Sequence, residues 1–370
     1  MNTARQTALQ VLNRCFRDSA WSSQTIDREA KTLDERDRAL VTHLVLGVLQ
    51  NATLLDMEID AFLQSKKTPD LPVRNILRLG AFQLLFSDKI PPRAAVYESV
   101  QLCKDSGFSS AAGLVNAVLR KIADTGLLPT DDLSVLYSHP KWFVERMIER
   151  RGREFTEALL KANNTEAPLN YHDAFAPGEQ YVQDAAAYTA VEMAEPEPGM
   201  KVLDACSAPG GKAFTSAVMM QNSGSILACD LHEKKLRLIR DSAQRLGISI
   251  ISAQCEDASV YDSGKKEAFD LVIADVPCSG FGVIRKKPEI RFKTEEQIRN
   301  LPAVQKRIAE NVAGYVKPGG KLLYATCTIF KEENEEIAHS INGFEILKEK
   351  TFWPHIDGTD GFYACVLRKC

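Results

Sequence analysis

Apolar residues recur every three to four positions along the first part of the chain. The pattern runs through residues 39–49, 76–85 and 114–122. Such spacing places apolar side chains along one face of an α-helix. Pro91 and Pro92 interrupt the pattern, so a new helix is expected to begin near Arg93. We therefore predict an all-helical domain over residues 1–135, followed by a helical connector over residues 136–180.

From about residue 200 the period changes, and short apolar runs alternate with helical patterns. The expected strands are residues 202–204, 226–230, 248–252, 269–275 and 321–325, and the expected helices include residues 233–246 and 299–315. Strands that alternate with helices indicate a parallel, doubly wound sheet. Residues 181–370 are therefore predicted to form one α/β domain.

Composition narrows the class of protein. The chain has 370 residues, of which 45% are hydrophobic, so it can build more than one core of ordinary size. The formal net charge is −3, so any contact with RNA must rely on local basic patches. No run of about 18 apolar residues is present and the N-terminus lacks a signal-peptide pattern, so no membrane contact is expected.

The nine cysteines argue against a metal site and against a disulfide framework. They are scattered, odd in number, and none forms a CxxC pair. Zinc sites and disulfide-rich domains need regular cysteine spacing. We expect a monomer in the reducing cytoplasm, where a few of these thiols can do chemistry.

A glycine-rich segment follows the first predicted strand of the α/β domain. It runs from Asp204 to Lys212 and opens a helix. Ligands of doubly wound sheets bind beyond the carboxyl ends of the strands, and Gly210 and Gly211 permit close backbone approach. The next two strands lead to Asp230 and Asp257. Acids in these places commonly bind the ribose and base of an adenosine cofactor, although a lone Gly-Gly is often only a tight turn.

Two cysteines follow neighbouring predicted strands. Cys278 lies in the run Asp275-Val-Pro-Cys, and Cys327 lies in the run Tyr324-Ala-Thr-Cys. A single cysteine is usually a small buried hydrophobe. Two at successive strand ends, one of them beside an acid, favour a catalytic role instead.

Cysteine chemistry would suit methylation of a pyrimidine ring. Carbon 5 of cytosine is a poor nucleophile until a thiolate adds to carbon 6. An acid near the base then stabilises the adduct, and a base removes the carbon-5 proton so that the thiol can leave. Asp275 suits the first task, and Cys278 could assist the last.

These motifs resemble the RNA cytosine-5 methyltransferases of the Sun/Nol1/Nop2 family. The resemblance rests on residues 208–212, 275–280, 324–328 with 332–336, and 358–362. It implies a Rossmann-like methyltransferase core that binds S-adenosyl-L-methionine. It also implies that Cys327 is the nucleophile and that Cys278 assists product release.

The resemblance further implies a set of cofactor-binding residues and a substrate. The cofactor-binding residues would be Cys206, Ser207, Ala208, Pro209, Gly210, Gly211, Lys212, Asp230, Asp257 and Asp275. Asp275 would also reach the base. The substrate would be small-subunit (16S) ribosomal RNA, methylated at one cytosine.

The N-terminal part is similar to the NusB-like, RNA-binding helical domain of the RsmB subgroup. Here the resemblance rests on Ala94–Glu98 and Gly113–Arg120. One departure concerns the small α/β subdomain that helps relatives to contact RNA. Only about ten residues separate Tyr171 from Tyr181, so this subdomain is expected to be missing.

A short basic segment follows the Cys278 motif. We expect Arg285, Lys286, Lys287 and Arg291 to lie beside the pocket and to contact RNA phosphates. An ordinary solvated loop is the alternative.

Three alternative functions stay open. A DNA cytosine methyltransferase would use Cys278 of the Pro-Cys motif as its nucleophile. A transfer RNA or other RNA could be the substrate, since the small subdomain is missing. An RNA-binding assembly factor could retain the fold without activity, and such a protein would not need to bind S-adenosylmethionine.

Overall fold

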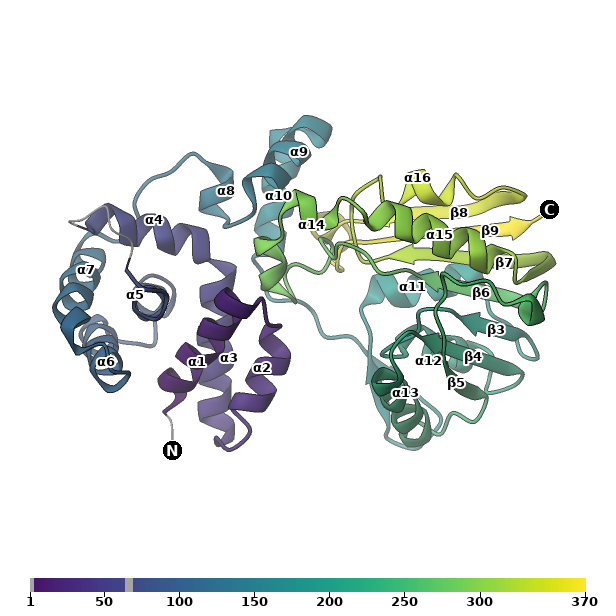
Figure 1. Cartoon of the computed structure of the whole chain (residues 1–370), viewed down its shortest axis with the longest axis horizontal. Helices are drawn as coiled ribbons and strands as arrows, with labels where there is room; N and C mark the ends of the chain where they lie inside the picture. Colours follow the sequence, from purple (N-terminus) through teal and green to yellow (C-terminus); the bar gives the residue numbers. More distant parts are fainter. Residues whose placement is uncertain (1–2, 64–68) are drawn as a thin grey trace. The chain divides into compact units, whose positions relative to one another are not determined.

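The structure is a computed structural model that describes residues 3–63 and 69–370. The chain forms two compact units (Figure 1). The first comprises residues 1–164 together with 284–293, and the second comprises residues 165–283 and 294–370. The proposed division at residues 135 and 180 stays a prediction.

The first unit is helical, as predicted. Its helices are α1 (Ala4–Asp18), α2 (Ser22–Glu29), α3 (Glu35–Gln50), α4 (Ala52–Phe62), α5 (Leu71–Phe86), α6 (Pro92–Asp105), α7 (Ala112–Thr125), α8 (Leu133–Leu136), α9 (Lys141–Arg151) and α10 (Arg153–Asn163), with short 3-10 turns η1 (Ser109–Ala111) and η3 (Pro288–Phe292). Every residue of α5 from Val73 to Gln83 is buried. A helix buried on all sides lies at the centre of its core. Figure 1 shows α5 end-on, enclosed by its neighbours.

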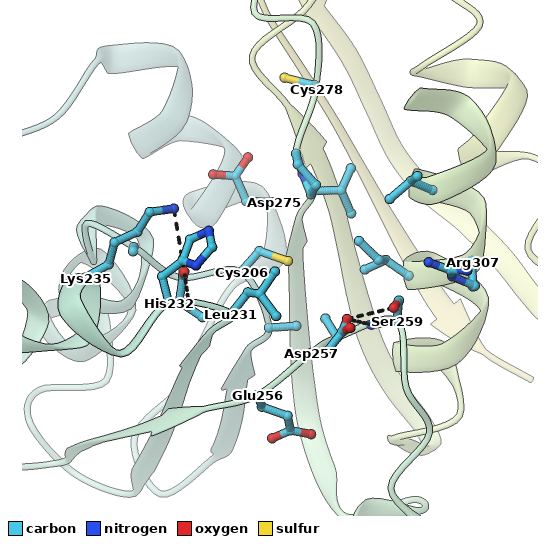
Figure 2. Close-up of a pocket in the computed structure, with 18 of the residues that line it drawn as sticks. Cys206, Leu231, His232, Lys235, Glu256, Asp257, Ser259, Asp275, Cys278 and Arg307 are labelled. Atoms are coloured by element: carbon cyan, nitrogen blue, oxygen red, sulfur yellow. Dashed lines mark hydrogen bonds and ion pairs between the residues drawn. The ribbon is translucent and has the colours of Figure 1, made fainter. Parts of the chain in front are cut away.

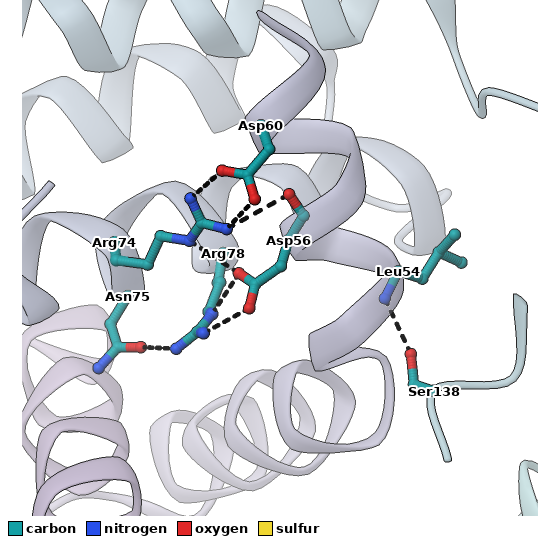
Figure 3. Close-up of polar contacts among 7 residues, drawn as sticks. All are labelled: Leu54, Asp56, Asp60, Arg74, Asn75, Arg78 and Ser138. Carbon is teal, nitrogen blue, oxygen red and sulfur yellow. Dashed lines mark hydrogen bonds and ion pairs between the residues drawn. The ribbon is translucent and has the colours of Figure 1, made fainter. Parts of the chain in front are cut away.

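Two arginines of α5 are buried and need partners. Arg74 and Arg78 both bind the carboxylate of Asp56 on α4, and Arg74 also binds Asp60 (Figure 3). Arg78 additionally donates to Asn75 Oδ1 at 2.8 Å. A buried cation is tolerated only when it is paired and hydrogen-bonded. This network therefore fixes α4 against the central helix.

The second unit is built on a seven-stranded sheet. Its strands are β3 (Lys201–Asp204), β4 (Ser225–Asp230), β5 (Ile251–Cys255), β6 (Phe269–Asp275), β7 (Val316–Thr326), β8 (Phe344–Phe352) and β9 (Phe362–Lys369). Their order in the sheet is β5-β4-β3-β6-β7-β9-β8. The first five are parallel, and β9 pairs antiparallel with both β7 and β8. This confirms the predicted doubly wound sheet, whose order reverses between β3 and β6 and opens a crevice there.

Alternate side chains of each strand enter different cores. In β6, Leu271 and Ile273 pack with helices α11 (Ala185–Ala194), α12 (Gly211–Met219) and α13 (Glu233–Arg245). Val272 and Ala274 pack on the other face with α15 (Leu301–Ala313) and α16 (Glu335–Ala338). The shorter elements of this unit are η2 (Ser263–Lys265), α14 (Glu295–Ile298) and α17 (Pro354–Asp357). Helices on both faces explain why the central strands read as continuous apolar runs.

A two-stranded ribbon occupies the segment where the resemblance predicted a shortened insertion. Strand β1 (Tyr171–Asp173) pairs antiparallel with β2 (Gln180–Val182), and Tyr171 lies opposite Val182. His172 stacks on Tyr188 of α11 with ring centroids 4.2 Å apart. The chain therefore crosses this segment by a short turn.

Across residues 3–63 and 69–370, no single helix is long and apolar enough to cross a membrane. The bent pair α3 and α4, which meet at 77°, has the required length and composition when taken together.

Candidate active site

The segment from Asp204 to Lys212 forms a turn between β3 and α12. The Ser207 N–H donates to Cys229 O on β4 at 2.7 Å, and the Gly210 N–H donates to Ser207 O at 2.7 Å. Gly210 has φ +111°, and a Cβ there would lie 2.5 Å from Phe214 Cζ. Only glycine fits this position, because it tolerates positive φ and has no side chain to clash.

A pocket of about 430 Å³ opens at the carboxyl ends of the central strands (Figure 2). Its lining includes the predicted residues Cys206, Ala208, Asp230, Asp257 and Asp275, and both Cys278 and Cys327. The predicted residues Ser207, Pro209, Gly210, Gly211 and Lys212 instead build the adjoining turn and the start of α12. The size is that of a small-molecule site.

The pocket has the chemistry that an adenosine cofactor requires. Leu231, Val304 and Ile308 give it apolar walls. The Asp230 carboxylate accepts the His232 N–H at 3.0 Å, and its neighbourhood includes Lys235 Nζ at 3.6 Å. Asp257 accepts the Ser259 N–H at 2.9 Å and the Ser259 hydroxyl at 2.7 Å, which lowers its pKa. Asp257 thus stays ionised, and both carboxylates can accept hydrogen bonds from hydroxyl or amino groups.

Lys212 and Asp275 form a buried ion pair beside this pocket. Lys212 Nζ lies 2.6 Å from Asp275 Oδ2, and the lysine side chain is 9% exposed. Burial alone would lower the lysine pKa, but Asp275, Asp204 and Cys327 together raise it. Lys212 therefore remains a cation, and its ammonium group also lies 5.0 Å from the ring centroid of Phe362.

Asp204 lies beneath this ion pair. Its side chain is completely buried, and burial raises its pKa to about 7, although Ser207 and Lys212 act in the opposite direction. An acid with such a pKa changes its charge in the physiological range.

The two motif cysteines touch. Cys278 Sγ lies 3.2 Å from Cys327 Sγ, although 49 residues separate them in the sequence. The hydrogen bond with Cys327, burial and nearby negative charge raise the pKa of Cys278 well above its usual value. The Cys278 sulfur therefore keeps its proton while Cys327 is the neighbour.

Backbone contacts fix three motifs around these thiols. The Gly282 N–H donates to Cys327 O at 3.0 Å, and the Gly361 N–H donates to Gly282 O at 2.8 Å. A Cβ on Gly282 would lie 1.8 Å from Gly361 O. The glycines of the Cys278 and Phe362 motifs are thus needed for close backbone approach at the site.

A buried carboxylate joins the two cysteine loops. Glu333 Oε2 accepts the Ser279 N–H at 2.8 Å and Gln305 Nε2 at 2.8 Å, and the same Gln305 amide donates to Pro277 O at 3.0 Å. Asn334 next to it donates to Thr328 O at 3.1 Å. These contacts hold the loops on which Cys278 and Cys327 lie.

Comparisons with known proteins agree with this architecture. Residues 191–343 match the model of the 16S rRNA methyltransferase RsmB/F family, and residues 2–124 match the NusB family. The probable ribosomal RNA small subunit methyltransferase B of Bacillus subtilis is 32% identical, over 99% of each chain. The chain belongs to the RsmB/F family. It is therefore an S-adenosylmethionine-dependent methyltransferase, as the sequence motifs predicted.

Other relatives and solved structures match most or all of the chain. The RsmB/F relative from Synechocystis is 29% identical over 100% of each chain. A crystal structure of the protein PH0851 matches with a TM-score of 0.79 and 24% identity, covering 100% of this chain and 99% of that one. A methyltransferase homologue from Pyrococcus horikoshii matches at 0.56 and 23% identity, over 65% and 98% of the respective chains. These structures support the fold.

The length of the first comparison agrees with the expected shortening within the RsmB/F family. The alignment with the Bacillus subtilis protein spans 441 positions, whereas this chain has 370 residues. At least 71 residues of the relative are therefore aligned with gaps in this chain.

The structure corrects one predicted RNA contact of this RsmB/F member. Arg291 is only 5% exposed, and it donates to Ile284 O at 3.2 Å, Asn163 O at 3.2 Å and Asn164 Oδ1 at 2.5 Å. Burial lowers its pKa to about 9. The guanidinium ties residues 284–293 to α10, so it serves the first unit instead of facing a phosphate.

The neighbouring basic residues belong to the same helical unit. Lys287 Nζ lies 5.5 Å from the Trp21 ring centroid, and the Glu289 carboxylate accepts the Ser22 N–H at 2.7 Å. Segment 284–293 thus leaves the second unit and packs with the first. No periodic pattern in the sequence indicates this exchange, because the segment is short and carries few apolar residues.

Sequence reasoning also missed several residues of the site. Leu231, His232 and Lys235 follow strand β4, and Val304, Arg307 and Ile308 come from α15. Leu231, His232 and Lys235 could have been predicted from their position directly after a strand. The α15 residues carry no local signal, because only the fold brings that helix to the pocket.

Proposed function

We propose that this chain methylates carbon 5 of a cytosine in small-subunit ribosomal RNA, with Cys327 as the nucleophile. The contact between Cys278 and Cys327 at the edge of the cofactor pocket is the observation that carries the proposal. Two thiols in contact serve a reaction that makes and then breaks a carbon–sulfur bond. The curated relatives are named as ribosomal RNA small subunit methyltransferases, which supports the substrate class.

The pocket residues would hold S-adenosylmethionine. Asp230 would accept hydrogen bonds from the ribose hydroxyls, and Asp257 would accept from the adenine amino end. Leu231, Val304 and Ile308 would pack on the base. When bound, the cofactor supplies an electrophilic methyl group.

Cys327 is the better nucleophile of the two cysteines. Lys212 is a buried cation that interacts with the charge of Cys327, and a nearby cation stabilises a thiolate. Cys278 keeps its proton under the same conditions. These electrostatics argue against a DNA cytosine methyltransferase, in which Cys278 would be the nucleophile.

Attack of the Cys327 thiolate on carbon 6 pushes electron density into the cytosine ring. Asp275 has one oxygen on Lys212 and borders the pocket, so its other oxygen can accept a hydrogen bond from the N4 amino group of the base. The ring so activated attacks the methyl group through carbon 5. The base must leave its stack to reach these groups.

Product release needs a base for the carbon-5 proton. Once Cys327 is bonded to carbon 6 it carries no negative charge, so the main cause of the raised Cys278 pKa is gone. Cys278 can then lose its proton and accept the one from carbon 5. The electrons of the broken C–H bond expel Cys327, and one proton is the net by-product.

RNA contacts and cellular context belong to the same proposal. Arg285, Lys286 and Lys287 remain candidate phosphate contacts, and we infer a monomeric enzyme that acts in the cytoplasm without a metal ion. Among residues 3–63 and 69–370, no group of three or more His, Cys, Asp or Glu side chains is placed to bind a metal.

A methyl-transfer assay on unmodified 16S rRNA tests the proposal. Purified protein with labelled S-adenosylmethionine should label the transcript, and bisulfite sequencing should then show one protected cytosine. Cys370→Ser, which changes an exposed cysteine, is the matched control and should keep full activity. Methylation that leaves the cytosine sensitive to bisulfite would exclude carbon 5, and methylation of transfer RNA alone would exclude the substrate.

A further inference from the structure

A second hollow is lined by residues of α6 and α7, two helices of the first unit that Figure 1 labels. It has a volume of about 770 Å³. Its lining includes Arg93, Val96, Tyr97, Asn116 and Arg120. All of them belong to the first unit, so this groove is separate from the cofactor pocket.

The groove has an exposed aromatic ring and two arginines, which are arranged along the two helices. Arg93 and Tyr97 are one turn apart on α6, and Asn116 and Arg120 are one turn apart on α7. Tyr97 is 66% exposed, the most exposed of the large hydrophobic side chains in the described chain. Val96 beneath it is buried and gives the groove an apolar floor.

The charges of the groove are not neutralised internally. Within residues 3–63 and 69–370, neither Arg93 nor Arg120 forms an ion pair or hydrogen bond through its side chain. Asp124 is the one acid among the residues that line the groove in this part of the chain. Two unpaired guanidinium groups around an exposed ring form a locally basic surface on a chain whose formal net charge is −3.

Four residues that line the groove lie in the two segments that carry the NusB resemblance, Ala94–Glu98 and Gly113–Arg120: these are Val96, Tyr97, Asn116 and Arg120. Packing explains the buried members of these segments, such as Ala95 and Val115. It does not explain Tyr97 or Arg120, which face solvent. Exposed aromatic and basic side chains gathered around one groove suit the binding of a nucleic acid.

We propose that this groove binds a single-stranded segment of the substrate RNA. The ring of Tyr97 stacks on an unpaired base, and Arg93 and Arg120 bind the phosphates on either side. The Asn116 amide lies where it can bind the edge of the stacked base. The inference rests on the proposed function, because it supplies the RNA-binding surface for that reaction.

RNA fits this groove better than an acidic peptide does. A peptide carboxylate would pair with the arginines but would leave the Tyr97 ring without a planar partner. Every nucleobase offers a face for stacking, and the alternation of base and phosphate matches the alternation of ring and guanidinium.

Binding of labelled single-stranded oligoadenylate to the full chain tests the proposal directly. Tyr97→Ala should weaken binding about tenfold, the effect of losing one stacked base. Tyr97→Phe retains the ring and should bind as the wild type does. Arg120→Glu should weaken binding and flatten its salt dependence, whereas Arg36→Glu, the same charge change on an exposed residue of α3, should do neither.

Methylation kinetics with 16S rRNA provide the second measurement. Tyr97→Ala and Arg120→Glu should raise the KM for RNA and leave kcat and S-adenosylmethionine binding unchanged. A wild type that binds oligoadenylate through the groove but transfers no methyl group would contradict the proposed function alone. Groove variants that bind and methylate naked RNA as the wild type does would overturn the groove proposal alone, and a defect confined to protein-containing ribosomal particles would reassign the groove to a protein partner.

Discussion

Cys278 Sγ and Cys327 Sγ lie 3.2 Å apart at the ends of neighbouring parallel strands. Strand β6 leads into the first cysteine loop and β7 into the second, so the sheet register itself brings the thiols together. Their contact lets the charge on one sulfur control the proton on the other. In the proposed mechanism this coupling gives the two cysteines different tasks, although they occupy equivalent positions in the sheet.

Removal of either cysteine should stop the reaction at a different step. Cys278→Ala should still form the covalent adduct with RNA but release it slowly, because no thiol accepts the carbon-5 proton. Cys327→Ala should form no adduct. Denaturing electrophoresis of protein mixed with RNA and S-adenosylmethionine separates these outcomes, since only an adduct migrates with the RNA. Full turnover by Cys327→Ala would refute the proposed mechanism.

Oxidation should join the same two sulfurs. Hydrogen peroxide converts a Cys327 thiolate to a sulfenic acid, and the Cys278 thiol then displaces water to form a disulfide. Activity should fall with oxidation and return after treatment with dithiothreitol. Peptide mapping should find the cross-link between residues 278 and 327.

Two variants control this experiment. Cys278→Ser cannot form the cross-link, so excess peroxide should oxidise its Cys327 sulfenic acid further to sulfinic acid, and adduct formation by this variant should not return after dithiothreitol. Cys370→Ser should behave as the wild type does, because that cysteine is exposed at the C-terminus. Recovery of the oxidised wild type by dithiothreitol without a cross-link between residues 278 and 327 would contradict the disulfide.

The position of the candidate site at the sheet edge could be predicted because several of its residues directly follow strands. Strand β6 has the predicted bounds, 269–275, and it ends at Asp275. Asp230 is likewise the last residue of β4. Where an apolar run marks a buried parallel strand, the next polar residue lies at the ligand-binding edge of the sheet.

Other parts of the fold carry no such signal. Strand β8 was not predicted, because its side chains are mostly exposed and it contains Glu345, Lys348 and Glu349 in place of an apolar alternation. Strand β5 begins at Ile251, three residues after the predicted start, since Ile248 is buried before the strand begins. The hydrogen bond between Glu333 and Gln305 depends on tertiary packing, and no local sequence pattern predicts it.

Glu333 should be needed to position the cysteine loops. In Glu333→Ala the Ser279 N–H and the Gln305 amide lose a buried acceptor, which costs about 1–3 kcal/mol of the free energy of unfolding. The rate of adduct formation should fall at least tenfold, while the KM for RNA stays the same. Glu333→Gln keeps one acceptor oxygen and should lose less activity. The measurement combines urea unfolding with single-turnover kinetics.

Glu336→Ala is the matched control for Glu333, because this exposed acid lies three residues later and pairs only with Lys331 at 3.4 Å. It should change neither stability nor rate. Equal rates for Glu333→Ala and the wild type would remove Glu333 from the site.

The buried acid Asp204 should make stability depend on pH. Burial raises its pKa to about 7 in the folded protein, against about 3.9 in an unfolded chain. Between these values the folded state holds a proton that the unfolded state has lost. The free energy of unfolding should therefore fall as pH rises from about 4 to about 7, and this contribution should level off above that range. The side chain of Asp204→Asn does not titrate. The free energy of unfolding of this variant, relative to that of the wild type, should therefore rise by on the order of 2 kcal/mol between about pH 5 and pH 8.

Urea unfolding of both proteins at these two pH values measures the gain. Asp131→Asn, which neutralises an exposed acid of the first unit, should show no comparable change with pH. A constant difference between Asp204→Asn and the wild type at both pH values would mean that Asp204 titrates alike in the folded and unfolded chains. Because Lys212 interacts with both Asp204 and Asp275, the methylation rate of Asp204→Asn reports whether the buried charge also supports the ion pair at the catalytic centre.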